Sequence, residues 1–400
     1  MKEIYFDHAA TTPMDKEVAE LVFKYTTEYF SNPSSMHNFG QRMRSAVENA
    51  RKQVAYAIGA KSVGEIAFCS GGTEANNMAI LGAARANKQK GNHIITTAAE
   101  HHSVLTTCKR LAEEGFELTI LPVDKHGTVS VQDVVNAVTD KTILVSIMHA
   151  NNEIGSIMPI AEIGKALKKL SNKIIFHTDA VQSIGKLPVN VDDLNVDILT
   201  ISAHKIYGPM GVGAMYLRQG TWWQPIMYGG GQERRRRPGT ENAPGIIGFG
   251  KAIELAMGRQ KEYVERLTKL RDKLVKMVFD KIPDVILNGH PTNRLPGYVS
   301  LCIKHIESEA LMLYLNMRGI AVSSGSACTS VLPEPSHVLA AIGVSREDAN
   351  SAIRITLGKD NTDEEVERFV EALVDIVSKL RAMFPVAKGD CRSCASEKCV

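Results

Sequence analysis

The sequence predicts an α/β fold built on a mainly parallel β-sheet. Between about residues 39 and 220, amphipathic helical segments alternate with short apolar segments of strand length. Repeated units of this kind favour a parallel sheet that is covered by helices on both faces. A chain of 400 residues, 44% of them hydrophobic, exceeds the size at which a single core usually divides. We therefore expect two domains, with ligands at the carboxyl ends of the strands of the larger one.

The first part of the chain supplies most of this sheet. Helices are expected over residues 42–58, from Thr73 onward, and over 103–114, 131–138 and 160–170. The expected strands are 65–69, 93–97, 116–121, 142–148, 174–176 and 196–201. A turn-rich segment at 229–239 precedes a helical pattern over 243–282, which is long enough to bridge two lobes.

The last third predicts a smaller α/β unit. Its expected strands are 298–302, 320–323 and 352–356, with helices at 308–317 and 363–384. We place the large domain at 13–256 and the small domain at 257–385, and leave open which lobe residues 1–12 join. Residues 386–400 are polar and rich in cysteine, and we expect a mobile tail.

Charge and composition argue against several classes of function. The chain has 47 basic and 44 acidic residues, so no overall field favours nucleic acid or a membrane surface. No segment has the length and apolar character of a signal peptide or of a membrane helix, which needs about 18 apolar residues. We therefore expect a cytoplasmic protein with reduced cysteines and a small-molecule substrate.

Two strand ends carry the side chains that a pyridoxal phosphate enzyme needs. Lys205 follows the strand at 196–201 and precedes a turn at Gly208, where a lysine can form a Schiff base with an aldehyde cofactor. Asp179 follows the strand at 174–176 and can face a pyridinium nitrogen. The pair predicts a pyridoxal phosphate site.

A phosphate site is predicted where a strand is followed by Gly71, Gly72 and Thr73. Free backbone N–H groups at the start of a helix, together with the Thr73 hydroxyl, can hold an anion. The alternative is an ordinary helix N-cap formed by Thr73. Ser202 and His204, beside Lys205, are further donors and favour the phosphate.

Histidines and asparagines follow two other strands. His101 and His102 can stack on a planar ring and exchange protons near neutral pH, or they are surface histidines or metal ligands. Asn151 and Asn152 can bond the phenolic oxygen of the cofactor, or they form Asx turns.

Two later residues add a nucleophile and an anion site. Cys328 lies in the small polar segment 323–330, where we expect an exposed loop, although most lone cysteines are buried and inert. Arg354 lies in an apolar strand and needs an anionic partner, which is either a substrate carboxylate or a structural ion pair.

These motifs, in this order, resemble the cysteine desulfurases of the NifS/IscS type over about residues 4–384. The matching strings are YFDHAATT (5–12), GGTE (71–74), NNEIG (151–155), HTDAVQ (177–182), SAHKIYG (202–208), GTEN (239–242) and SSGSACTS (323–330). The resemblance implies a fold-type I pyridoxal phosphate transferase with a mainly parallel seven-stranded sheet, normally a homodimer. It implies conversion of L-cysteine to L-alanine, with the sulfur left as a persulfide for iron–sulfur cluster assembly or related sulfur trafficking.

The resemblance also implies a role for each matching residue. Lys205 is the cofactor lysine and moves the substrate Cα proton, while Cys328 accepts the sulfur. His101 stacks on the cofactor ring and is a candidate for assisting deprotonation of Cys328. The implied cofactor-binding residues are Gly72, Thr73, His101, Asn152, Asp179, Gln182, Ser202, His204, Lys205 and, from the other subunit, Thr240. Arg354 and Asn152 are implied to bind the substrate.

Several alternatives remain open from the sequence. A selenocysteine lyase or an aminotransferase would share the cofactor site. Residues 245–251 read G-x-x-x-x-G-K, as in a nucleotide-binding loop, but a helical pattern precedes them and Ala252 lacks the required hydroxyl.

The cysteine-rich tail is a departure from the family pattern. Cys391, Cys394 and Cys399 could relay sulfur, bind zinc or an iron–sulfur cluster with a fourth ligand from elsewhere, or be incidental thiols. Cys328 is a further candidate cluster ligand during sulfur transfer. The expected partner is an iron–sulfur scaffold or another sulfur-acceptor protein, and no direct contact with nucleic acid or a membrane is expected.

Overall fold

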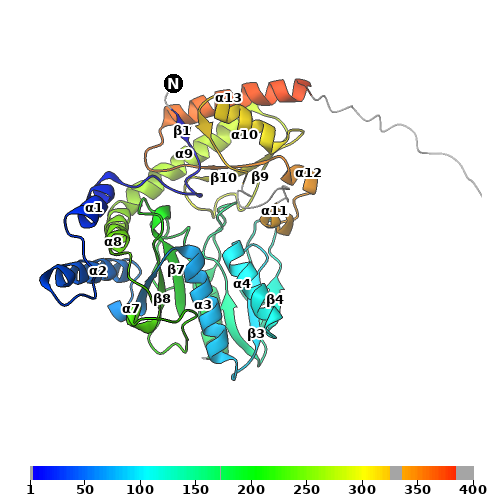
Figure 1. The fold of residues 1–400 in the computed structure, drawn as a ribbon. Helices are drawn as coiled ribbons and strands as arrows, with labels where there is room; N and C mark the ends of the chain where they lie inside the picture. Colours follow the sequence, from blue (N-terminus) through cyan, green and yellow to red (C-terminus); the bar gives the residue numbers. More distant parts are fainter. Residues whose placement is uncertain (1–2, 172, 325–335, 384–400) are drawn as a thin grey trace, which may run out of the picture.

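The computed structural model describes residues 3–171, 173–324 and 336–383, which fold around a seven-stranded sheet (Figure 1). In spatial order its strands are β2 (Ile66–Cys69), β8 (Gly213–Leu217), β7 (Ile198–Ser202), β6 (Ile175–Asp179), β5 (Thr142–Ser146), β3 (His93–Thr97) and β4 (Glu117–Leu121). β8 is antiparallel to both of its neighbours, and the other pairings are parallel. The expected mainly parallel sheet is therefore confirmed.

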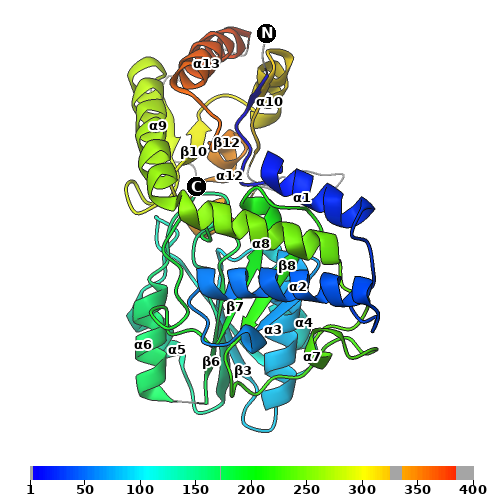
Figure 2. The same ribbon diagram turned by 90° about the vertical axis from the view of Figure 1, so that its left-hand side faces the viewer.

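Helices cover both faces of this sheet because successive strand residues point to opposite sides. Phe68 and its neighbour Ala67, for example, belong to different hydrophobic clusters. On the Ala67 side lie α3 (Gly72–Asn87) and α4 (His102–Glu113). On the Phe68 side lie α2 (Asn38–Ala57), α5 (Val131–Ala137), α6 (Ile160–Leu170) and α8 (Ala243–Gly258). Figure 2 shows α2 and α8 crossing in front of the sheet.

The helical pattern expected over 243–282 is two helices, α8 and α9 (Gln260–Lys281), and not one. Arg259 leaves the helical conformation between them, with φ −108° and ψ 3°. The packing partner changes at this residue. α8 contributes Phe249 and Ile253 to the cluster on the large sheet, whereas α9 contributes Leu270 and Leu274 to a second cluster.

That second cluster surrounds a three-stranded antiparallel sheet in the order β12 (Ala352–Thr356), β10 (Tyr298–Ile303) and β9 (Val285–Leu287). α10 (Ser308–Met317) and α13 (Asp363–Met383) contribute to the same cluster. β11 (Ile320–Ala321) is shorter than the strand expected at 320–323, and it pairs in parallel with β1 (Ile4–Tyr5). Ile4 and Phe6 are buried in this second cluster.

The two clusters support a large domain at 13–256 and a small domain at 257–385, a division that stays a prediction. Two short helices within 257–385 do not follow this division. Val338 of α11 (His337–Ala341) and Ala349 of α12 (Arg346–Ala349) belong to the cluster on the large sheet. The remaining helices are α1 (Lys16–Thr27), which packs against α8, and the short α7 (Gln232–Arg235).

Residues 245–251 form no phosphate loop, because they lie inside α8. Glycine there serves helix packing. A Cβ atom on Gly250 would lie 2.6 Å from Cα of Ala50 on α2, and one on Gly248 would lie 2.7 Å from the Pro209 ring. The nucleotide-binding alternative therefore has no structural support. In the described part of the chain, no helix combines the length and apolar character needed to cross a membrane.

Candidate active site

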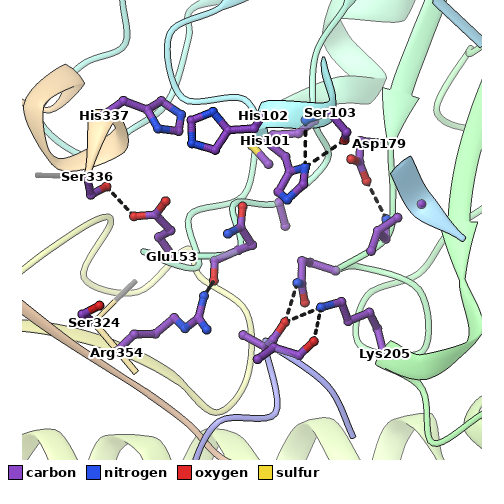
Figure 3. A pocket seen from close by; sticks show the side chains of 18 of the residues that line it. His101, His102, Ser103, Glu153, Asp179, Lys205, Ser324, Ser336, His337 and Arg354 are labelled. Carbon is purple, nitrogen blue, oxygen red and sulfur yellow. Dashed lines mark hydrogen bonds between the residues drawn. The ribbon is translucent and has the colours of Figure 1, made fainter. Parts of the chain in front are cut away.

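A cavity of about 1020 Å³ lies between the large sheet and the second cluster (Figure 3). It opens at the carboxyl ends of β6 and β7, where parallel strands commonly present ligand-binding residues. Ten of the predicted site residues line it: Gly72, Thr73, His101, Asn152, Asp179, Gln182, Ser202, His204, Lys205 and Arg354.

Of the other predicted site residues, the structure describes Thr240 alone. Thr240 does not line the cavity of its own chain. Cys328 and the tail residues Cys391, Cys394 and Cys399 lie outside the described residues, so their roles stay predictions. Among the described residues, no group of three or more His, Cys, Asp or Glu side chains could hold a metal ion.

Residues 9–12, at the end of the string YFDHAATT, hold Lys205 at the cavity. It lies in a single 3₁₀ turn, Ala203–Lys205, directly after β7. Its Nζ donates hydrogen bonds to the carbonyl oxygens of Ala9 and Ala10, both at 2.6 Å. Thr12 fixes the same turn, because its hydroxyl donates to the His204 carbonyl at 2.8 Å and accepts from the Tyr207 N–H at 2.7 Å.

Asp179 is held at the end of β6 with both carboxylate oxygens bonded. Oδ1 accepts from the Val181 N–H at 2.9 Å, and Oδ2 accepts from Asn76 Nδ2 at 2.7 Å. Figure 3 shows the carboxylate near His101 on the wall of the cavity. It is thereby oriented to face a cationic group in the cavity, as the nitrogen of a protonated pyridine ring would be.

The residues at the start of α3 fit a phosphate group. The N-cap is Gly71, and no side chain caps the helix, so the alternative of a Thr73 N-cap is wrong. The Ser202 hydroxyl is buried and has no hydrogen-bond partner in the part of the chain that the structure describes. Its Cβ lies 3.9 Å from the point where a Gly72 Cβ would stand. An unbonded hydroxyl beside an uncapped helix N-terminus suits an anion.

His204 adds a neutral imidazole beside this phosphate cradle. Burial, together with the charges of Lys205 and Lys186, lowers the pKa of His204 to about 4. Its Nδ1 lies 3.2 Å from the Thr11 hydroxyl. The donor set as a whole therefore fits pyridoxal phosphate, with a lysine amine, a carboxylate and an anion cradle in one cavity.

Arg354 has the structural ion pair that the sequence left open as one alternative, and its binding of a substrate carboxylate stays a prediction. It forms an ion pair with Asp7 at 2.8 Å and donates to the Asn152 carbonyl at 3.1 Å. Its buried Nε has no acceptor among the described residues. The guanidinium therefore keeps capacity for a second anion, and a substrate carboxylate in the adjoining cavity is one that its fork suits.

Gln182 is more constrained than the sequence indicated. Its Nε2 donates to the Ala9 carbonyl at 3.0 Å, and its Oε1 accepts from the Tyr298 hydroxyl at 2.5 Å. The second amide hydrogen on Nε2 is the group that can still contact a ring oxygen.

Sequence reasoning missed Asn76 and Ser103, and it did not predict the contacts that His102 and Glu153 make. Asn76 and Ser103 follow the predicted motifs by one helical turn or less, and only their hydrogen bonds identify them. On the other wall, Ser336 donates to Glu153, and the rings of His102 and His337 lie 4.6 Å apart. Burial raises the pKa of Glu153 to about 6. A string such as NNEIG names Glu153 but gives no sign of its partner.

Comparison with known proteins agrees with this geometry. The chain is 53% identical over 384 residues to "Cysteine desulfurase IscS" of Dictyoglomus turgidum, covering 96% of this chain and 97% of that protein. It is 51% identical over 392 residues to the protein of the same name from Methanosarcina thermophila, covering 98% and 96%.

Solved structures give the same result. The fold matches a structure titled "NIFS-LIKE PROTEIN" with a TM-score of 0.89 and 38% identity, covering 94% of this chain and all of that one. It matches the NifS-like protein from Rickettsia africae with a TM-score of 0.85 and 34% identity, with the same coverage. The model of the family Aminotransferase class-V matches residues 4–369. The chain belongs to the class-V aminotransferase family.

Proposed function

We propose that the protein is a cytoplasmic, pyridoxal phosphate-dependent cysteine desulfurase that converts L-cysteine to L-alanine and passes the sulfur to Cys328. The observation that carries the proposal is the cavity that brings Lys205, Asp179 and the unbonded Ser202 hydroxyl together with Arg354. Relatives named cysteine desulfurase, matched over nearly their whole length, support it.

The cofactor supplies an aldehyde that links to amines and a ring that stabilises negative charge developing at Cα. Gly72, Thr73, Ser202 and His204 would hold its phosphate, together with the partner subunit's Thr240. Asp179 would hold a proton at the ring nitrogen. His101 would contact the ring face, and Gln182 and Asn152 its ring oxygen.

The protein side chains then divide the remaining work. Arg354 and Asn152 bind the substrate carboxylate, and the Lys205 amine removes the Cα proton. The Cys328 thiolate attacks the substrate sulfur. The carbon–sulfur bond breaks, Cβ gains a proton, and the products are alanine and a Cys328 persulfide. A sulfur-acceptor protein, which we propose is an iron–sulfur scaffold, takes the persulfide sulfur.

The experiment is incubation of the purified protein with L-cysteine, followed by amino-acid analysis and mass spectrometry. We expect alanine and a mass increase of one sulfur atom on Cys328. The Cys328→Ala variant should keep the bound cofactor and lose sulfide release in the presence of a reductant. Keto acid formation without a Cys328 persulfide would instead indicate an aminotransferase, and full desulfurase activity in Cys328→Ala would refute the role of this cysteine.

A further inference from the structure

His101 receives two hydrogen-bond donors on the same ring nitrogen. The backbone N–H of Ser103 donates to His101 Nδ1 at 3.1 Å, and the Ser103 hydroxyl lies 2.8 Å from that nitrogen. A backbone N–H can only donate, so Nδ1 must present its lone pair. The neutral ring therefore carries its hydrogen on Nε2.

The direction of the Ser103 hydroxyl is set by Asn76, which is 1% exposed. Asn76 Nδ2 donates to Asp179 Oδ2 at 2.7 Å and to Ser103 Oγ at 2.8 Å. The amide orientation is fixed because the Asp179 carboxylate can only accept, so Nδ2 faces it and Oδ1 accepts from the Thr200 hydroxyl at 2.6 Å. With Ser103 Oγ already an acceptor, its single hydrogen is directed to His101 Nδ1.

The same direction continues into the sheet. The Thr200 hydroxyl has given its hydrogen to Asn76, so its oxygen accepts from His177 Nε2 at 3.4 Å. The Ser146 hydroxyl donates to His177 Nδ1 at 2.8 Å. Burial lowers the pKa of His177 to about 3, so this ring is neutral and each of its nitrogens has one role. Along this series, each residue donates a hydrogen bond to the next one, from Ser146 through His177, Thr200, Asn76 and Ser103 to His101.

We propose that Asn76 and Ser103 are positioning residues that fix the tautomer of His101, so that the neutral ring offers an N–H, and not a lone pair, to the cavity. Asn76 ties the same ring to Asp179 through one amide group. The catalytic consequence rests on the proposed function. Neutral His101 acts as a hydrogen-bond donor in the cavity. Because Nε2 already carries a hydrogen, it cannot accept the proton of the Cys328 thiol.

The charges around His101 agree with this assignment. Burial is the main cause that lowers the pKa of His101, and Lys205, His102 and His337 lower it further, while Asp179 acts in the opposite direction. Adding a proton at Nδ1 would also break both hydrogen bonds from Ser103. The ring is thus kept neutral by its surroundings and kept in one tautomer by Ser103.

The direct test is long-range ¹H–¹⁵N NMR of the full-length protein labelled on histidine, with and without pyridoxal phosphate. A His101→Gln variant assigns the ring signals. We expect an unprotonated Nδ1 and a protonated Nε2 at pH 7 to 8 in both forms. A protonated Nδ1 in the wild-type protein would overturn the proposal.

Three substitutions separate positioning from a purely structural role. In Ser103→Ala and Asn76→Ala the backbone N–H of residue 103 still donates to Nδ1, but the directed hydroxyl donor is lost. Both variants should therefore show a weaker preference for the Nε2–H tautomer and let His101 titrate at higher pH, whereas Ser103→Thr should restore the wild-type signals. The matched control is Ser130→Ala, which removes the N-cap hydroxyl of α5 without touching the cavity. Unchanged tautomer and titration in both alanine variants would overturn the proposal.

The rate of desulfuration should change in the variants that alter the tautomer of His101. We expect Ser103→Ala to lower kcat about tenfold with KM within about twofold, and Ser130→Ala to change neither. Equal losses in Ser103→Ala and Ser130→Ala would reduce Ser103 to a structural role and overturn the proposal. Absence of desulfurase activity in the wild-type protein would refute the proposed function alone, because NMR reads the ring without turnover.

Discussion

Behind Lys205 lies a second, buried lysine that the sequence does not distinguish from any other. Lys186 is 3% exposed, and its Nζ donates to the carbonyl oxygens of Gln182 at 3.1 Å and Lys205 at 3.3 Å. Burial, and then the charge of Lys205, lowers the pKa of Lys186 to about 7. Its folded-state pKa thus lies well below the 10.5 of an ordinary lysine.

This shift predicts a pH dependence of stability. Between pH 7 and about 10.5 the unfolded chain binds the Lys186 proton and the folded chain does not, so the contribution of Lys186 to stability rises with pH. In Lys186→Met this increase should be missing. Urea unfolding at pH 6.5 and 9.5 would measure it, with Lys52→Met, an exposed lysine on α2, as the control. A wild-type advantage over Lys186→Met that is equal at both pH values would contradict the prediction.

Arg354 allows a separate test of substrate binding. In Arg354→Lys the charge beside Asp7 is kept but the planar fork is lost, so the amine cannot serve Asp7, the Asn152 carbonyl and a substrate carboxylate together. We expect KM for L-cysteine to rise about tenfold to a hundredfold, corresponding to about 1.4 to 2.7 kcal/mol of lost binding, with a smaller change in kcat. Steady-state kinetics of alanine formation measure both. A fall in kcat with unchanged KM would argue against carboxylate binding.

At the scale of single residues, the sequence predicts the role of a residue when its place in the chain, such as the end of a buried strand, already indicates its chemistry. Lys205 and Asp179 end buried strands, which parallel topology brings to one edge of the sheet. Asn76 gives no such signal, because an asparagine inside a helix has no pattern of its own. Its role follows only from the contacts that α3 makes with β6, β7 and α4.

At the scale of elements, the sequence predicts some helices and strands to the residue and gives no sign of others. The bounds expected for β3, β12, α6 and α10 match the structure residue for residue. β8 is not predicted because a glycine and four apolar residues after a turn show no alternation. The break at Arg259 was missed because helical propensity continues across it, and only the change of packing partner from the large sheet to the second cluster ends α8.

Helix packing gives a prediction with an internal control. Gly250→Ala would place a Cβ 2.6 Å from Ala50 on α2, and we expect a loss of about 1–3 kcal/mol in the free energy of unfolding. Gly258→Ala, at the end of the same helix, meets no atom within 4 Å and should gain up to about 1 kcal/mol. Chemical denaturation of both variants measures the difference. Equal effects of the two substitutions would show that α8 and α2 are less tightly packed than the structure indicates.

At the scale of the whole molecule, apolar side chains are exposed around α1 and α2. Phe23, Phe30, Met36 and Phe39 are 65%, 64%, 89% and 51% exposed, and they lie within one short stretch of the chain. So many exposed apolar side chains in one stretch of a chain are typical of an interaction surface. They support the proposal that two copies associate.

A charge placed in this apolar stretch should therefore weaken both association and cofactor binding. We expect Phe30→Glu to shift the protein from dimer toward monomer in sedimentation velocity, because association would bury the new carboxylate. If the partner subunit's Thr240 completes the phosphate site, affinity for pyridoxal phosphate should fall about tenfold, the loss of about one hydrogen bond to a charged group. Leu313→Glu, an equally exposed site on α10 at 59%, is the control and should change neither quantity. A wild-type monomer with full cofactor affinity would show that one chain builds the site alone.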